Sequence, residues 1–137
     1  MALVLEDYRP CDTEPFMSDR QLDYFRRKLV SWKAELQRDS ADTVVAMQME
    51  VLNAPDMVDR ATSESDRSIE LRARDRQRKL ISKIDQALAR IDDGSYGYCE
   101  DTGEPISLRR LEARPIATLS IEAQERHERR ERVYRDA

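Results

Sequence analysis

The sequence predicts a mainly α-helical protein, made of a long antiparallel coiled-coil hairpin, a small zinc-ribbon-like globular module and a C-terminal helix. Two observations support this fold class. Ala, Glu, Lys, Leu and Arg make up about 45% of the chain, close to the share that is typical of coiled coils and long helices. Glycine is confined to residues 94–119, and residues 18–93 contain a single helix breaker, Pro55.

Composition and charge exclude several functional classes. Charged residues make up 38% of the 137 residues, and the net charge is -4. A general DNA clamp would need a clearly basic balance. No apolar run approaches the roughly 18 residues of a membrane-spanning helix, and the first residues lack the basic region of a signal peptide. We therefore expect a soluble, cytoplasmic monomer that does not act at a membrane.

Residues 1–17 are expected to form an extended N-terminal segment, after which a helix begins. Ser18 and Gln21 form a capping box, in which Ser18 caps the amide of Gln21 and Gln21 reaches back to Ser18. Apolar residues then recur at 3-4 spacing, which predicts one helix of about 34 residues. These residues are Leu22, Phe25, Leu29, Trp32 and Leu36.

Pro55 ends this helix, and a second stretch without Gly or Pro runs from Asp56 to Asp93. Two such stretches joined by a short turn predict an antiparallel hairpin over residues 18–93, with its tip at 53–61. The apolar phase of the second helix is clear at its end, in Leu80/Ile81, Ile84, Leu88 and Ile91. We expect Ile69 and Leu71 to extend it, more thinly, toward the turn.

Residues 94–119 are expected to form a compact loop module with short strands and the outline of a zinc ribbon. Cys99-x-x-Thr102 and Ser120-x-x-Ala123 reproduce the spacing of a four-cysteine zinc site, but only Cys99 can supply a thiolate. We therefore expect no bound metal and a packed Cys99 thiol. The expected core is Tyr96, Tyr98, Ile106, Leu108, Leu111, Ile116, Leu119 and Ile121.

Residues 120–137 predict a highly charged surface helix, docked along one edge by Ile121, Ala123 and Val133. This helix carries the only histidine of the sequence, His127, which is a conceivable stray metal ligand. No nucleophile elbow, phosphate-binding loop or dinucleotide fingerprint occurs. We therefore assign no catalytic residue and expect that the protein is not an enzyme.

Two charged clusters stand out in the hairpin. Asp56 and Asp59 lie three residues apart just after Pro55, in the expected first turn of the second helix, where acids either cap the helix or meet a metal ion or polar groups in a recess. A basic stripe follows at 4-3-4 spacing; it is either a solvated face paired with acids such as Asp75 or a docking surface for an acidic partner or a phosphate. The stripe comprises Arg72, Arg76, Lys79 and Lys83.

Three motifs occur in order over roughly residues 18–125: the tip PDMVDRA, the helix segment ELRARDRQRKLI, and residues 106–115 of the loop module. This combination resembles the DksA family of bacterial transcription regulators, which bind RNA polymerase. The resemblance implies that the hairpin enters the secondary channel of RNA polymerase and modulates initiation, for example at rRNA and stringent-response promoters. It also implies that the protein does not bind DNA sequence-specifically.

The resemblance further assigns individual residues. Asp56, Asp59 and Ala61 are expected near the polymerase active site. Arg76 and Arg72 are expected to dock on polymerase. The effector ppGpp is expected at the polymerase interface, contacted by Lys83, Arg114 and Leu80.

Two departures from the family pattern affect this assignment. The former metal-ligand positions Cys99, Thr102, Ser120 and Ala123 resemble those of zinc-independent members. Gln124 stands where the family usually has a phosphate-facing Lys, which removes one charge from the ppGpp site. Two alternatives stay open: a secondary-channel factor that promotes transcript cleavage, and a helical-hairpin adaptor unrelated to transcription.

Overall fold

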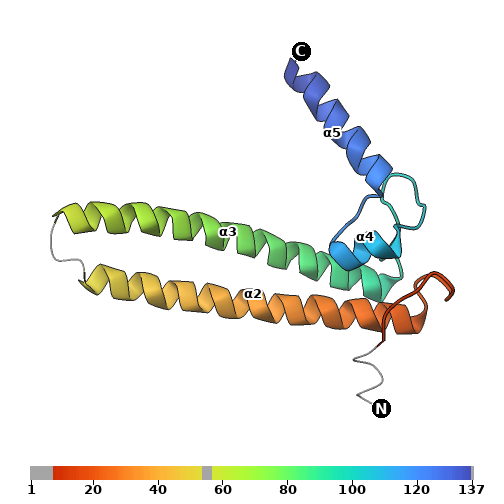
Figure 1. The fold of residues 1–137 in the computed structure, drawn as a ribbon, viewed down its shortest axis with the longest axis horizontal. Helices are drawn as coiled ribbons and strands as arrows, with labels where there is room; N and C mark the ends of the chain where they lie inside the picture. Colours follow the sequence, from red (N-terminus) through yellow and green to blue (C-terminus); the bar gives the residue numbers. More distant parts are fainter. Residues whose placement is uncertain (1–7, 54–56, 137) are drawn as a thin grey trace. The chain divides into compact units, whose positions relative to one another are not determined.

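The computed structural model describes residues 8–53 and 57–136, with side chains described for all of these except 43, 47, 50–53, 57–63, 135 and 136. Four helices lie in this part of the chain: α2 (Asp19–Asn53), α3 (Met57–Asp93), α4 (Leu108–Ala113) and α5 (Ile121–Asp136) (Figure 1). None of the described helices combines the length and the apolar character that a membrane span requires. The chain folds into two compact units, one of residues 30–85 and one of residues up to 29 and from 86 onward.

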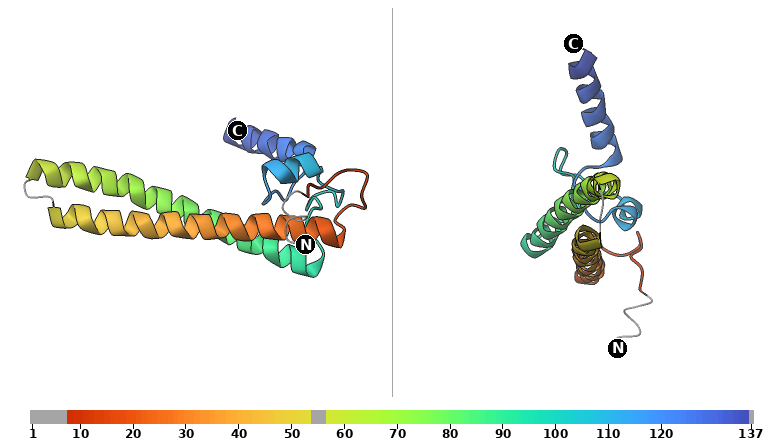
Figure 2. Two further views of the ribbon diagram at one scale, coloured as in Figure 1. Left: turned by 60° about the horizontal axis from the view of Figure 1, so that its bottom comes forward. Right: turned by 90° about the vertical axis from the view of Figure 1, so that its left-hand side faces the viewer.

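In the unit of residues 30–85, α2 and α3 run antiparallel and side by side, as both views show (Figures 1 and 2). Leu36 and Ile84 are buried, and the Lys33 Nζ atom lies 2.7 Å from Asp85 Oδ1 across the two helices. The predicted hairpin is thus confirmed. Its boundaries follow from the long stretches without Gly or Pro on either side of Pro55.

The predicted continuation of the apolar phase through Ile69 and Leu71 is wrong. Ile69 is 63% exposed and Leu71 is 45% exposed. The 3-4 spacing counted back from Ile81 instead reaches polar positions, and these are half-buried: Arg67, Glu70, Arg74 and Gln77. Ile69 and Leu71 each lie one residue off this heptad phase, so the helix turns them toward solvent.

The second unit begins with an ordered N-terminal segment that packs on the start of α2. The Tyr8 ring is buried, lies edge-on to Tyr24 at 6.0 Å and is covered by the Arg20 guanidinium at 4.0 Å. Its hydroxyl donates to the Glu14 carboxylate. Burial and the neighbouring Glu14 carboxylate raise the pKa of Tyr8 to about 12, so the phenol remains a donor at neutral pH.

The capping box is confirmed in one half only. The Gln21 amide donates to Ser18 Oγ at 3.4 Å, as predicted. The Gln21 side chain, however, accepts from the Met17 amide at 2.8 Å, and its Nε2 donates to the Cys11 carbonyl at 3.3 Å. The Ser18 amide instead donates to the Pro15 carbonyl, which leaves the fully buried Gln21 side chain to tie the N-terminal segment to the helix.

The loop module contains less β-structure than predicted. In place of short strands, it has one isolated bridge, between Tyr98 and Pro105, within the described residues. Gly97, just before the bridge, and Gly103, within the loop that it closes, both adopt positive φ, and the chain bends at these positions instead of extending a strand pair. The helix α4 that follows was not predicted, since it is only six residues long.

Most of the predicted module core is buried: Tyr96, Ile106, Leu108, Leu111 and Ile116. Tyr96 packs against Phe25 of α2 at 5.6 Å and donates its hydroxyl to the Pro115 carbonyl at 2.8 Å. The placement of two further residues in the core is wrong. Tyr98 is 38% exposed because it packs edge-on against Phe16 at the surface, and Ile121 is 51% exposed.

The C-terminal helix α5 docks through Ala123 in its first turn and through His127 in its second, whose Nε2 lies 2.8 Å from Asp101 Oδ2. Ala123 is fully buried, whereas Ile121 and Val133 are exposed, so the predicted docking edge is wrong for two of its three residues. Ser120 caps the helix by accepting from the Ala123 amide at 3.2 Å. Beyond this point the helix extends away from α4, as Figures 1 and 2 show.

Candidate functional site

The acidic tip falls largely outside the described residues. Asp56 is not described. Asp59 and Ala61 belong to the beginning of α3, but their side chains are outside the described part of the chain. The structure therefore places the backbone of Asp59 and Ala61 in the first turns of α3, and the roles of all three residues stay predictions from the sequence.

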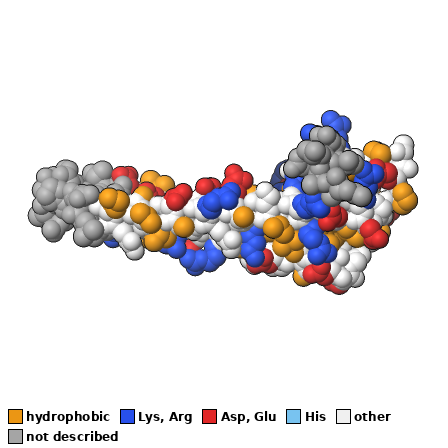
Figure 3. Space-filling model, turned by 90° about the horizontal axis from the view of Figure 1, so that it is seen from below, with side chains coloured by type: hydrophobic (Ala, Val, Ile, Leu, Met, Phe, Trp, Pro, Cys, Tyr) orange, Lys and Arg blue, Asp and Glu red, His pale blue; other side chains and the backbone are white. Residues whose placement is uncertain are grey.

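The basic stripe lies on α3 in the unit of residues 30–85. Arg72, Arg76, Lys79 and Lys83 are all exposed, and no ion pair within the described residues involves any of them. Asp75 instead lies 3.8 Å from Arg78, which is outside the stripe. The interpretation of this stripe as a face neutralised by intramolecular pairs is therefore wrong for Asp75. Figure 3 shows acidic, basic and apolar side chains interspersed on one face of the described part of the chain.

The residues assigned to ppGpp belong to both units. Lys83 is exposed and Leu80 half-buried in the unit of residues 30–85, while Arg114 is exposed in the other unit. Arg114 caps α4, and its amide donates to the Arg110 carbonyl at 2.7 Å. Gln124 is half-buried on α5, where its Nε2 donates to Glu128 Oε1 at 3.3 Å.

A charged clamp, defined as Lys28, Tyr24 and Glu112, fixes the helix that leads to Arg114. Lys28 Nζ donates to the Glu112 carbonyl at 2.7 Å and to its Oε2 at 2.9 Å. Burial raises the pKa of Tyr24 to about 12, with the Glu112 carboxylate as the next cause. Burial alone would raise the pKa of Glu112, but the hydrogen bonds from Lys28 and Tyr24 lower it below its usual value. Sequence reasoning missed this clamp because its partners lie 84 residues apart.

Two of the former metal-ligand positions, Thr102 and Ser120, lie beside the buried sulfur of Cys99. Cys99 is 2% exposed, which confirms the prediction of a packed thiol. Burial raises the pKa of this thiol. Hydrogen bonds from the Thr102 hydroxyl and from the backbone amides of Ser120, Thr102 and Asp101 outweigh burial and lower the pKa to about 6. Amide groups thus stabilise a thiolate here.

These residues do not fit a zinc ion. A structural zinc site needs four thiolate or imidazole ligands. Ser120 Oγ already accepts from the Ala123 amide, and Ala123 has no donor atom. His127 Nε2 lies 2.8 Å from Asp101 Oδ2, and one imidazole with one thiolate would still leave a zinc ion two ligands short. No group of three or more metal-ligating side chains occurs among the described residues.

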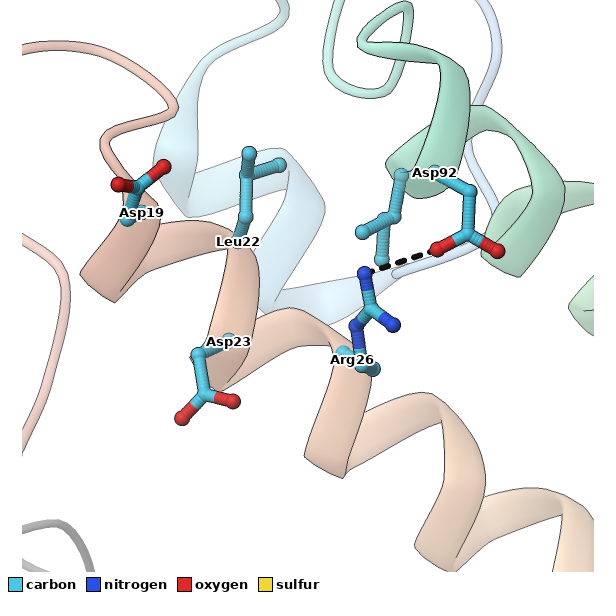
Figure 4. A pocket seen from close by; sticks show the side chains of 6 residues that line it. Asp19, Leu22, Asp23, Arg26 and Asp92 are labelled. Carbon is cyan, nitrogen blue, oxygen red and sulfur yellow. Dashed lines mark hydrogen bonds and ion pairs between the residues drawn. The ribbon is translucent and has the colours of Figure 1, made fainter.

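A shallow cavity of about 440 Å³ lies between the start of α2 and the end of α3 (Figure 4). Arg26 and Asp92 face one another in it, with 2.9 Å between Nη2 and Oδ1. Asp23 pairs with Arg27 at 3.0 Å. Two of the three acids that line the cavity are thus paired, and we assign no binding function to it.

Comparison with known proteins identifies the family. A family model described as "DnaK suppressor protein DksA, N-terminal domain" matches residues 21–91. The chain belongs to the DksA family. A second model, described as "Prokaryotic dksA/traR C4-type zinc finger", matches residues 94–129. This DksA family module therefore retains the zinc-finger outline around a set of residues that does not fit zinc.

Relatives and solved structures extend the DksA match over nearly the whole chain. It is 69% identical to the RNA polymerase-binding transcription factor DksA of Caulobacter vibrioides, over 95% of this chain and 92% of the relative. It is 46% identical to the protein of the same name from Escherichia coli, over 93% and 85%. The structure of transcription factor DksA2 from Pseudomonas aeruginosa matches with a TM-score of 0.80 and 42% identity, covering 95% of this chain and 97% of that one.

Proposed function

We propose that this DksA family member binds RNA polymerase through its secondary channel and modulates transcription initiation together with ppGpp, without sequence-specific DNA binding. The observation that carries the proposal is the 69% identity, over 95% of the chain, to a relative named as an RNA polymerase-binding transcription factor. We further propose that it does so as a soluble, cytoplasmic monomer with no catalytic residue of its own.

The proposal assigns the tip and the stripe different tasks. Asp56, Asp59 and Ala61 would act near the polymerase active site. Arg72 and Arg76 would dock on an acidic polymerase surface. Their exposure and their lack of ion pairs within the described residues support this task, because charges that are already neutralised contribute little to docking.

The effector ppGpp would bind at the polymerase interface. Lys83 and Arg114 would contact its phosphates, with Leu80 alongside. Arg114 suits this role because its guanidinium is exposed while its backbone is held by Arg110. Gln124 supplies no positive charge, so we expect weaker ppGpp dependence than in a Gln124→Lys variant.

Polymerase binding tests the docking assignment. We expect the wild-type protein to bind purified RNA polymerase and Arg76→Ala to bind about tenfold more weakly, because one unneutralised docking charge is lost. Arg38→Ala, at an exposed arginine of α2, is the matched control and should bind like the wild type. Equal affinity of all three proteins would contradict the docking assignment, and no binding by the wild type would contradict the proposed function.

A further inference from the structure

One face of α3 changes from polar to apolar side chains halfway along the hairpin. Within residues 64–79, every side chain is exposed except four, which recur at 3-4-3 spacing. We call these four the polar seam: Arg67, Glu70, Arg74 and Gln77. The same spacing continues through Ile81, Ile84, Leu88 and Ile91, which are half-buried or buried. A single heptad face therefore carries four polar residues followed by four apolar ones.

The polar seam is only partly satisfied. Glu70 Oε2, Arg74 Nε and Gln77 Oε1 are each buried and have no hydrogen-bond partner within the described residues. A buried polar atom without a partner costs more than the same atom in water, and the cost is larger for charged groups. Helix contact here thus gains little apolar burial and leaves three atoms unpaired. Opening the contact would return these atoms to water.

Beyond Leu36, no described side chain of α2 is buried. In the same unit, the half-buried residues that α2 presents after Leu36 are Ser40 and Val44, among those whose side chains are described. By contrast, Ile84 is fully buried and the Lys33–Asp85 ion pair closes the hairpin beside it. Stability within the unit is therefore concentrated at residues 81–85 of α3 and falls over 67–77.

We propose that the polar seam is a weak joint at which the α2–α3 contact opens locally, so that the turns of α3 over 67–77 lose tertiary support and open more readily, and that docking on RNA polymerase uses this opening. The second part rests on the proposed function; the first does not. A hairpin that separates at the seam can adjust its two helices to a binding surface, and the three unpaired atoms then gain water or partner groups. Helix packing that is complete at every layer would resist this adjustment.

Hydrogen–deuterium exchange of the full-length protein tests the joint itself. We expect amides of residues 67–77 to exchange about tenfold faster, or more, than those of residues 81–91. A variant with an apolar seam, Glu70→Leu with Arg74→Leu and Gln77→Leu, should slow exchange over 67–77 and raise the melting temperature. The single variant Gln77→Leu should show a smaller change in the same direction. Ser68→Leu, at an exposed position of the same stretch, is the control and should leave exchange unchanged.

Uniform protection along α3 in the wild type would overturn the weak joint. Fast exchange that neither Gln77→Leu nor the triple variant slows would also overturn it, because fraying from the turn would then explain the exchange.

Polymerase affinity tests the use of the joint. The apolar-seam variant should bind RNA polymerase at least about fivefold more weakly than Ser68→Leu, despite its greater stability. Affinity equal to or tighter than that of Ser68→Leu would overturn the use of the joint in docking. If the wild type and Ser68→Leu do not bind polymerase, the proposed function fails, and the exchange experiment still decides whether the joint exists.

Discussion

Cys99 is the one residue of the four-cysteine zinc motif that this chain retains as a cysteine. Its sulfur is buried and accepts hydrogen bonds from three backbone amides and the Thr102 hydroxyl. These donors supply the positive potential that a metal ion provides in a four-cysteine site. The turn around Cys99 also persists, with the Cys99 amide donating to the Glu104 carbonyl at 2.8 Å.

The Cys99 thiolate should make stability depend on pH. Its pKa is about 6 in the folded protein, well below that of an unfolded thiol. Because the thiol has a lower pKa in the folded protein than in the unfolded chain, its ionisation stabilises the fold. This contribution is fully present at pH values above the unfolded pKa and is lost as the pH falls through the folded pKa of about 6. As the pH rises from the folded pKa of Cys99 to its unfolded pKa, the free energy of unfolding of the wild type should increase relative to that of Cys99→Ser by roughly 1–4 kcal/mol. Urea unfolding at several pH values measures this difference. A parallel pH profile for the two proteins would show that the thiolate is not stabilised.

Gly97 and Gly94 allow backbone strain to be separated from packing. Both adopt positive φ, 91° and 85°. A Cβ at Gly97 would meet the Met17 side chain at 3.0 Å, whereas one at Gly94 would meet nothing within 4 Å. Gly94→Ala should cost about 1–2 kcal/mol, and Gly97→Ala should cost more, as measured by thermal unfolding. Equal costs would mean that Met17 moves aside freely.

At the scale of elements, α4 depends on contacts made outside itself. Six residues are too few for a helix to be stable alone. Ser107 caps its start by accepting from the Arg110 amide at 3.2 Å, and Lys28 of α2 binds the carbonyl and carboxylate of Glu112 near its end. The clamp of Lys28, Tyr24 and Glu112 therefore sets the position of the backbone that carries Arg114.

Removal of the clamp should destabilise the loop module. Lys28→Met leaves the partly buried Glu112 carboxylate without its charged partner, so we expect a loss of about 1–2 kcal/mol in the free energy of unfolding. Lys33→Met is the matched control. Its partner Asp85 is half exposed, so that the loss should stay below about 1 kcal/mol. Chemical denaturation measures both, and equal losses would contradict a special role for Lys28.

The sequence predicts the hairpin well because periodicity and breaker residues determine long helices locally. Prediction fails where tertiary contacts decide. Ile69 and Leu71 are apolar yet lie off the heptad phase, so the packing partner, and not hydrophobicity, determines their exposure. Helix α4 and the side-chain bonds of Gln21 depend on residues distant in sequence. The charge pattern alone singles out the tip acids Asp56 and Asp59 and the stripe residue Lys83, but their specific roles, and the assignment of Arg114 and Leu80 to ppGpp, come from the family motifs.

At the scale of the whole molecule, a DksA-type chain carries a zinc-finger outline without a zinc ligand set. Purified protein should contain no stoichiometric zinc by metal analysis, and a chelator should leave its melting temperature unchanged, because hydrogen bonds to Cys99 and the buried module core replace the metal. Restoring cysteine at Thr102, Ser120 and Ala123 should introduce zinc binding and chelator sensitivity. One zinc per wild-type chain would contradict this account.

We expect the hairpin tip to act on initiation after the protein has docked on RNA polymerase. The most direct measurement is transcription in vitro from an rRNA-type promoter, with and without ppGpp, using wild-type protein, Asp59→Asn and the control Asp66→Asn at an exposed acid of α3. The account predicts that Asp59→Asn binds polymerase with unchanged affinity but loses inhibition, whereas Asp66→Asn inhibits like the wild type. Full inhibition by Asp59→Asn, or none by the wild type, would contradict it.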